Sequence, residues 1–144
     1  MHPYPHTYRA TTSGAATGLV TVSSPGLPDL PSAPPPEFDG PGGLWSPETM
    51  LCAAIADCFV LTFRAVARAS KFEWRSLDCQ VEGLLERAEG GARFTRYVTH
   101  ATLHAPAGID RERATQLLEK AERGCLVAAS LNGTRELTCT FVET

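Results

Sequence analysis

The chain of 144 residues has the length of a typical single domain and can bury a substantial hydrophobic core. Hydrophobic residues make up 43% and charged residues 20%, which excludes wholesale disorder and a membrane protein. The net charge is −3 and no dense cluster of lysine and arginine occurs, so we expect no nucleic-acid partner. No basic start followed by an apolar run occurs at the N-terminus, so we expect a cytoplasmic, reducing location without structural disulfides.

The N-terminal residues are predicted to form a β-hairpin. His6–Thr12 is the first expected strand, and Ser13 and Gly14 begin the turn region. Gly18–Ser24 is rich in β-branched residues and partly alternates between apolar and polar positions, which predicts the second strand.

A loop is predicted over residues 25–46. From Pro25 to Pro47 the chain contains eight prolines and four glycines. Proline removes a backbone donor and fixes φ, so this composition favours polyproline-II-like loop rather than helix or sheet. A loop of this length in a compact domain indicates either disorder or a functional surface.

A long helix is expected to follow the loop. Ser46 is a suitable N-cap, Pro47 suits the first helical position, and Glu48 favours the positive first turn. Leu51–Ala69 is then apolar on nearly every side, which predicts a central helix buried on several sides, in part by a second subunit. Three charges within this stretch argue against a membrane span: Asp57, Arg64 and Arg68.

The rest of the chain predicts an α+β fold. Leu77–Leu85 alternates as a half-buried strand, and Phe94–His104 is the return strand of a second hairpin. Asp110 is expected to cap an amphipathic helix, and Cys125–Leu131 is a short apolar run. Glu136–Val142 is the last expected strand, so the predicted order is ββ–α–ββ–α–β.

Familiar catalytic and metal-binding patterns are absent from the sequence. There is no CxxC pair, no GxSxG elbow, no GxGxxG and no phosphate-binding loop of the Walker type. His100 and His104 are expected to share one strand face, where we interpret them as solvated or packed because no third metal ligand is apparent. We therefore expect no metal and no bound cofactor.

The five cysteines are the remaining candidates for chemistry. Cys79 and Cys139 lie on the apolar faces of predicted strands and are interpreted as core residues. Cys52 is in the first turns of the long helix, where the helix dipole favours a thiolate, yet its apolar neighbours favour a core role. By pattern alone Cys58 and Cys125 are also structural, although Cys125 would begin a short helix, a position that favours a thiolate.

Two segments resemble the OsmC/Ohr family of osmotically inducible and organic hydroperoxide resistance proteins. The first is SPETMLCAAIADCFVLTF, and the second is AERGCLVAASL. They occur in the family's order, and the resemblance covers about residues 45–144 well. It implies an OsmC-like fold over a single domain, residues 1–144, with two β-hairpin regions and a buried central helix, assembled as an intertwined homodimer.

The resemblance also implies a mechanism. Cys58 matches the peroxidatic cysteine, which attacks an organic hydroperoxide and becomes a sulfenic acid. Cys125 matches the resolving cysteine, which condenses with it to a disulfide. An external dithiol, in this family typically a lipoyl group, reduces that disulfide.

This mechanism requires a cation near the attacking sulfur, because an ordinary thiol with a pKa of about 8.5 is only a few per cent ionised at pH 7. Cys58 is about three turns inside its helix, too deep for the dipole to help. Glu48 matches the family's residue that orients an active-site arginine, but it lies about 15 Å along the same helix. The two therefore meet only in a site built from two chains; otherwise Glu48 is a simple first-turn charge.

The sequence departs from the family at this arginine. Residues 25–47 contain no lysine or arginine, and Arg9 is the only N-terminal cation, so it is the candidate partner of the thiolate; an exposed strand residue is the alternative. Two hypotheses follow. The first is a hydroperoxide reductase, in which Phe59 and Phe63 join Phe38, Leu44 and Trp45 around the substrate. The second is a stress-related binding or redox-sensing module of the same fold without efficient turnover.

Overall fold

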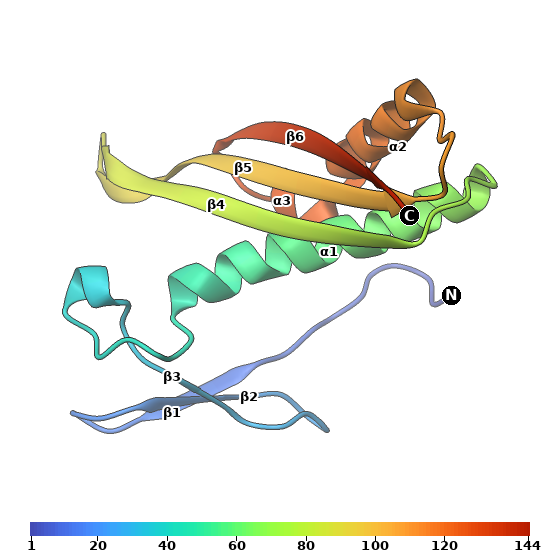
Figure 1. The fold of residues 1–144 in the computed structure, drawn as a ribbon. Coiled ribbons are helices and arrows are strands. Elements are labelled where there is room, and N and C mark those ends of the chain that lie inside the picture. Colours follow the sequence, from blue (N-terminus) through green and yellow to red (C-terminus); the bar gives the residue numbers. More distant parts are fainter. The chain divides into compact units, whose positions relative to one another are not determined.

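The computed structural model describes residues 1–144, which divide into two compact units, Met1–Met50 and Leu51–Thr144 (Figure 1). The prediction of one domain over the whole chain stays a prediction. The α+β class is confirmed, because the chain contains two three-stranded sheets and three α-helices.

The first unit contains an antiparallel sheet of β1 (Thr11–Gly14), β2 (Val20–Ser23) and β3 (Leu30–Ser32), with β2 in the centre. The predicted hairpin is confirmed, but the predicted first strand, His6–Thr12, is wrong in its bounds. The ladder begins where Thr11 faces Ser23, the last residue of β2, so the residues before β1 have no partner strand. The expected turn dipeptide Ser13-Gly14 belongs to β1, and the turn follows it.

The prediction of an unstructured loop over residues 25–46 is wrong in part. It contains β3 and a short 3₁₀ helix, η1 (Pro36–Phe38). β3 is an edge strand, where a proline such as Pro31 costs no ladder hydrogen bond. The turn after η1 requires Gly40, because a Cβ there would lie 1.7 Å from the carbonyl oxygen of Pro34. This part of the loop is therefore tightly specified.

Helix α1 (Pro47–Ala69) begins as predicted. Ser46 Oγ accepts a hydrogen bond from the Thr49 backbone N–H at 3.1 Å, and Thr49 Oγ1 accepts one from the Ser46 N–H at 2.9 Å. This reciprocal pair is a capping box with threonine in the third position. By length and composition α1 also meets the requirements of a membrane-spanning helix, a test that core helices of soluble proteins pass as well.

The second unit contains a sheet in the order β4–β5–β6. β4 (Ser76–Ala88) and β5 (Gly91–Ala105) form the predicted hairpin, and β6 (Thr134–Glu143) pairs with β5 in parallel. The crossover between β5 and β6 contains α2 (Arg111–Gly124), which Asp110 caps by accepting from the Arg113 N–H, and α3 (Leu126–Ala129).

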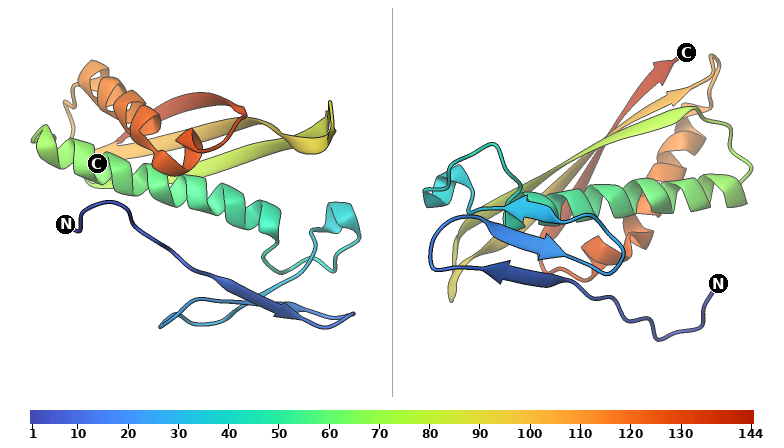
Figure 2. Two further views of the ribbon diagram at one scale, coloured as in Figure 1. Left: turned by 180° about the vertical axis from the view of Figure 1, so that it is seen from behind. Right: turned by 90° about the horizontal axis from the view of Figure 1, so that it is seen from below.

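The core of this unit lies between the sheet and the helices (Figure 2). Alternate residues of β5 face the helices and are buried, as are the residues of α1 at four-residue spacing. The central cluster comes from α1, β5 and α2: Phe59, Phe63, Ala67, Ala101, Leu103, Ala114, Leu117, Leu118 and Ala121.

Within the single chain α1 is buried along one face, and the expected further burial by a second subunit stays a prediction. Leu61 is 49% exposed, and Ala54 and Ala65 are exposed beside it, so an apolar strip of the helix is open. An apolar surface of this kind needs a covering element. Association with a second copy remains the proposal for what covers it.

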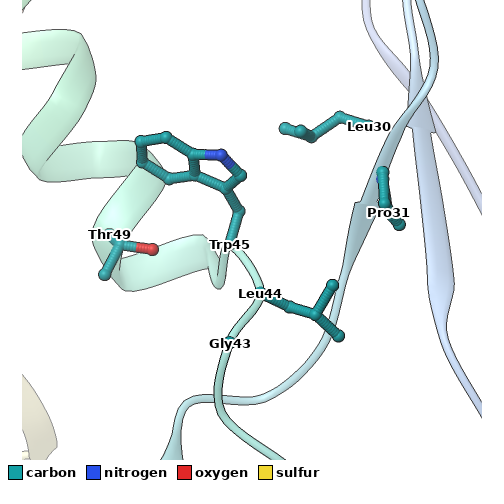
Figure 3. A pocket seen from close by; sticks show the side chains of 6 residues that line it. All are labelled: Leu30, Pro31, Gly43, Leu44, Trp45 and Thr49. Carbon is teal, nitrogen blue, oxygen red and sulfur yellow. The ribbon is translucent and has the colours of Figure 1, made fainter.

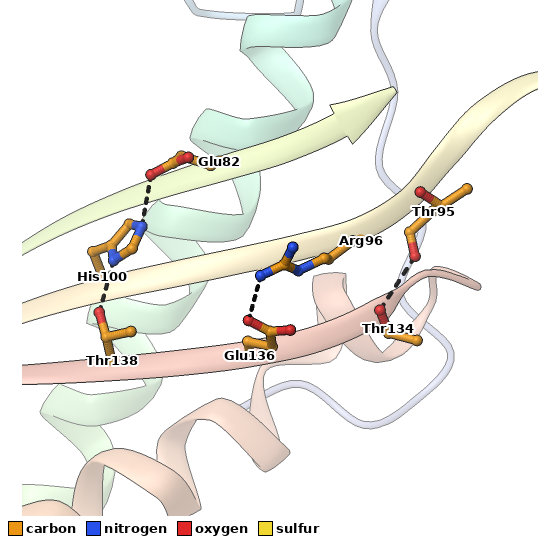
Figure 4. A network of polar contacts seen from close by, with 7 residues as sticks. All are labelled: Glu82, Thr95, Arg96, His100, Thr134, Glu136 and Thr138. Atoms are coloured by element: carbon orange, nitrogen blue, oxygen red, sulfur yellow. Dashed lines mark hydrogen bonds and ion pairs between the residues drawn. The ribbon is translucent and has the colours of Figure 1, made fainter. Parts of the chain in front are cut away.

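The outer face of the second sheet is polar (Figure 4). His100 lies between Glu82 and Thr138, 2.7 Å from each, and Arg96 pairs with Glu136 at 2.7 Å. His104, on the same face, lies 2.8 Å from Asp78. The two histidines therefore share a strand face, as predicted, and each has its own carboxylate neighbour.

Candidate functional site

Cys58 lies in the middle of α1 and is partly buried. Its Sγ is 3.9 Å from the hydroxyl oxygen of Thr62, one turn further along the helix. Thr62 in turn donates a hydrogen bond to the carbonyl oxygen of Cys58 at 2.7 Å. The sulfur therefore contacts a neutral hydroxyl, and no basic side chain forms a hydrogen bond with it.

Cys125 lies between α2 and α3 and is 1% exposed. Its thiol donates to the carbonyl oxygen of Ile55, 3.8 Å away on α1. Burial raises the pKa of Cys125 to about 11, although the backbone N–H groups of Ala128 and Val127 work in the opposite direction. The expectation that this position favours a thiolate is therefore wrong, because the loss of solvation outweighs the N-terminus of a helix of only four residues.

The structure brings Cys58 and Cys125 together. Cys58 packs against the cluster of Ile55, Tyr97, Cys125 and Ala128. After burial, the side-chain interaction with Cys58 is a further cause of the raised pKa of Cys125. All five cysteines are free thiols, so the pair is in its reduced form. Burial and the neighbouring Cys58 thiol both disfavour a charge on Cys125, so Cys125 keeps its proton.

The other three cysteines have structural positions. Cys79 and Cys139 face the helices and pack against the central core, as predicted, and burial raises the pKa of both, that of Cys79 to about 11. Burial also raises the pKa of Cys52, against a hydrogen bond from the backbone of Gly83. The helix dipole therefore does not activate Cys52, and the core interpretation is favoured.

Glu48 and Arg9 both belong to the first unit, and they are not paired within it. One carboxylate oxygen of Glu48, Oε2, is buried and has no hydrogen-bond partner. Arg9 is exposed, lies just before β1, and forms no ion pair; only its backbone carbonyl is used, by Ser24. The chain by itself therefore leaves both predicted groups unpartnered.

The predicted pocket of apolar side chains around a substrate does not form within either unit. Phe59 and Phe63 are 1% and 0% exposed and belong to the core of the second unit, so they are not free to line a pocket. Leu44 and Trp45 line a cavity of about 350 Å³ in the first unit, where Trp45 faces Leu30 across the opening (Figure 3). Phe38 lines a separate cavity of about 530 Å³ that also contains Glu48.

Sequence reasoning did not identify the groups that surround the two thiols. Thr62 lies four residues after Cys58, and this helical spacing is a signal that finds it. The Ile55 carbonyl and the buried Tyr97 belong to elements that meet only after folding. No sequence pattern identifies them.

A comparison with protein families decides the relationship. The family model described as OsmC-like protein matches residues 40–140. These residues include α1, the β4–β5 hairpin, α2, and the thiols of Cys58 and Cys125. The chain belongs to the OsmC-like protein family. The resemblance seen in the two cysteine segments is thereby confirmed.

The relatives of the chain include one that is uncharacterized and one that is named for an activity. The chain is 29% identical over 106 residues to the uncharacterized protein YmaD of Bacillus subtilis, covering 72% of this chain and 71% of that protein. It is 27% identical over 114 residues to a protein named peroxiredoxin OsmC from Escherichia coli, covering 79% of this chain and 78% of that protein.

Solved OsmC-like structures agree with this fold. An organic hydroperoxide resistance protein OsmC from Legionella pneumophila gives a TM-score of 0.76 at 26% identity, over 96% of this chain and 98% of that chain. An OsmC-like protein of unknown function from Vibrio cholerae gives a TM-score of 0.84 at 14% identity, over 94% of this chain and 99% of that chain. The second likeness shows the fold alone.

Proposed function

We propose that the protein is a thiol-dependent peroxidase that reduces organic hydroperoxides. The observation that carries the proposal is the pair of reduced thiols, Cys58 and Cys125, in one buried cluster. A relative named peroxiredoxin and a solved relative named as a hydroperoxide resistance protein support the same chemistry. The cytoplasm, which keeps thiols reduced, is the proposed location.

The first step uses the more accessible thiol. The thiolate of Cys58 attacks one oxygen of the peroxide bond, the O–O bond breaks, and the alkoxide that leaves takes a proton to become an alcohol. Cys58 is oxidised to sulfenic acid and the hydroperoxide is reduced. The hydroxyl of Thr62, 3.9 Å from the sulfur, is placed to turn its proton from the helix carbonyl towards the thiolate.

The second step uses the buried thiol. Cys125 attacks the sulfur of the sulfenic acid, water leaves, and a Cys58–Cys125 disulfide forms. Because Cys125 is almost fully buried and its pKa is about 11, it stays protonated until this attack and resists direct oxidation. An external dithiol, with a lipoyl group as the proposed class, then exchanges with the disulfide and leaves oxidised.

The proposed site is completed by a second copy of the chain. The open apolar strip of α1 beside Leu61 and the unpartnered Glu48 carboxylate both support an intertwined homodimer. In this arrangement Glu48 orients a cation towards the partner's thiolate, and Arg9, exposed and free of ion pairs, is the proposed cation.

A second function is favoured by one observation. Both polar side-chain neighbours of Cys58, the hydroxyl of Thr62 and the thiol of Cys125, are uncharged. A thiolate without a nearby cation reacts slowly, and the protein would then be a redox-sensing or binding module of the same fold.

Stopped-flow oxidation of the reduced protein by cumene hydroperoxide distinguishes the two functions. The peroxidase loses thiol much faster than free cysteine does, and Cys58→Ser abolishes the reaction, whereas the matched core variant Cys79→Ser retains it. Oxidation no faster than that of free cysteine would instead support the redox-sensing or binding module.

A further inference from the structure

Tyr97, on β5, lies among the side chains that surround the two thiols. It is 4% exposed and belongs to the cluster that contains Ile55 and Cys125, against which Cys58 packs. The other side chains of this cluster are hydrocarbons and thiols, so its one hydroxyl is that of Tyr97. A polar group in such surroundings requires a reason, because apolar side chains fill the space at lower cost.

The chain makes room for the Tyr97 ring in three ways. Where the register of β4 and β5 shifts, β5 contains one extra residue, Thr95. This bulge brings Phe94 to the same side as Tyr97, and their rings stack with centroids 5.8 Å apart. A Cβ on Gly133 would lie 2.6 Å from Tyr97 Cε2, and one on Gly83 would lie 3.0 Å from Phe94 Cε1. The bulge and the two glycines therefore fix the ring in one place.

The hydroxyl of Tyr97 forms no hydrogen bond within the chain. The one buried side-chain nitrogen or oxygen atom without a partner is Oε2 of Glu48, so the Tyr97 hydroxyl reaches the surface of the chain. Burial raises the pKa of Tyr97, so the hydroxyl keeps its proton at neutral pH. A ring that is held by packing and whose hydroxyl is free offers a donor in a fixed position.

The second step of the proposed reaction needs a proton donor. When the sulfur of Cys125 attacks the sulfenic acid of Cys58, the S–O bond breaks, and the oxygen leaves readily only if it receives a proton. The hydroxyl of Thr62 also lies near Cys58, but it donates to the Cys58 carbonyl oxygen at 2.7 Å, and an alkyl hydroxyl is a weaker acid than a phenol. Tyr97 is the stronger and the uncommitted acid.

We infer that Tyr97 is the general acid of disulfide formation, an inference that rests on the proposed function. Its hydroxyl gives a proton to the oxygen that leaves Cys58, while the sulfur of Cys125 bonds to the sulfur of Cys58. The proton of Cys125 then restores the phenol. Cys125 is oxidised, the sulfenic sulfur is reduced to the disulfide level, and one water is released. Tyr97 therefore acts in the second step and has no part in the first.

Competition between disulfide and sulfinic acid measures the second step by itself. The sulfenic acid of Cys58 is either attacked by Cys125 or oxidised by a second peroxide. The hydrogen peroxide concentration that gives equal amounts of the two products, measured by mass spectrometry, is therefore proportional to the rate of disulfide formation. Tyr97→Phe keeps the ring and should lower this concentration at least about tenfold, because a general acid typically contributes about 10²–10⁴-fold. An unchanged concentration overturns the inference.

Two control variants separate the donor from packing. Tyr4→Phe makes the same change at a tyrosine that is 86% exposed in the first unit, and it should leave the concentration unchanged. Phe94→Leu removes the stacked ring but keeps the Tyr97 hydroxyl, so it should lower the concentration less than about threefold. Equal effects of Phe94→Leu and Tyr97→Phe would show that packing, not proton donation, is the cause, and would overturn the inference.

The first step serves as a further control. In stopped-flow oxidation, Tyr97→Phe should lose the Cys58 thiol within about twofold of the unmodified rate, whereas an equal slowing of both steps overturns the assignment to the second. If the unmodified protein reacts no faster than free cysteine, the proposed peroxidase fails. The product ratio still decides the role of Tyr97, because it does not depend on how fast the sulfenic acid forms. Sulfinic acid without disulfide at every peroxide concentration in the unmodified protein also overturns the inference.

Discussion

The thiol of Cys125 lies 3.8 Å from the carbonyl oxygen of Ile55, which is one helical turn before Cys58 on α1. This contact fixes the start of α3 against α1 and therefore holds the two thiols on the same side of the helix. Both sulfur atoms belong to one apolar cluster that also contains Tyr97. The position of Cys125, the proposed resolving thiol, is thus defined by packing between two elements that are far apart in the sequence.

Oxidation is expected to join these two cysteines and no others. One equivalent of hydroperoxide should give a Cys58–Cys125 disulfide by peptide mapping, because Cys125 is the thiol packed in the same cluster as Cys58. In Cys125→Ser the sulfenic acid should persist and be trapped by dimedone. Cys139→Ser is the matched control and should map as the unmodified protein does; a disulfide to Cys79 or Cys139 would contradict the resolving role of Cys125.

Alkaline pH is expected to destabilise the fold through the buried thiols. The pKa values of Cys125 and Cys79 are raised to about 11 from 9.0, so the folded state holds these protons more tightly than the unfolded state. Their contribution to the free energy of unfolding is complete below pH 9 and is lost as the pH rises through 11. The free energy of unfolding then falls by up to about 1.4 kcal/mol per pH unit for each fully buried thiol. Urea unfolding at pH 8.5, 9.5 and 10.5 measures this decrease.

The control for this pH dependence is Cys125→Ala. This variant should be less stable at pH 8.5 but should lose stability less steeply between pH 9 and 11. Thr138→Ala, a change at an exposed residue that removes no thiol, should leave the dependence of stability on pH as it is in the unmodified protein. A slope that is unchanged in Cys125→Ala means that the thiol does not titrate in this range.

Much of the local structure follows from sequence, because its causes are local. The cap of Ser46 and the alternation of Leu77–Leu85 each predict their element without reference to the rest of the chain. The edge strand β3 is different, because Pro31 argues against a strand and is tolerated only where no neighbour needs its N–H. Whether a strand is at an edge is a property of the sheet.

The candidate site is predictable only in part for the same reason. Cys58 and Cys125 are identified by their resemblance to family segments, whereas by pattern alone both are core residues. The burial of Phe59 and Phe63 in the core depends on how α1 meets β5 and α2. The partner of Glu48 is not found within the chain at all, so no reasoning on one chain identifies it.

Gly83 is expected to be required by its close contact with α1. An added Cβ would lie 3.0 Å from Cys52 Sγ and 3.0 Å from Phe94 Cε1. Gly83→Ala should therefore destabilise the protein by about 1–3 kcal/mol, as overpacking does. In a Cys52→Ala background the cost should be smaller, and the double-mutant cycle in urea measures the difference; equal costs in both backgrounds would show that the sulfur is not the obstacle.

Arg135, on β6, and Arg96, on β5, should differ in how much their replacement destabilises the protein. Arg135 lies 2.6 Å from Glu122 and also donates to the Glu122 carbonyl at the end of α2, with both side chains largely buried. Arg96 pairs with Glu136 at about half exposure. Arg135→Gln should cost about 1–3 kcal/mol, because it leaves a poorly solvated carboxylate unpaired, whereas Arg96→Gln should cost less than about 1 kcal/mol. Equal costs in urea unfolding would contradict this assignment.

The open strip of α1 is expected to be the contact of a homodimer. Light scattering on a sizing column should give a mass near twice 15.5 kDa. Leu61→Asp should weaken the dimer at least about tenfold, because a buried unpaired charge is costly at an apolar interface. Leu84, on the outer face of β4, is almost equally exposed, at 47% against 49%, so Leu84→Asp is the matched control and should leave the mass unchanged. A monomer in the unmodified protein removes the shared site for Glu48, and a dimer that survives Leu61→Asp moves the interface to another surface.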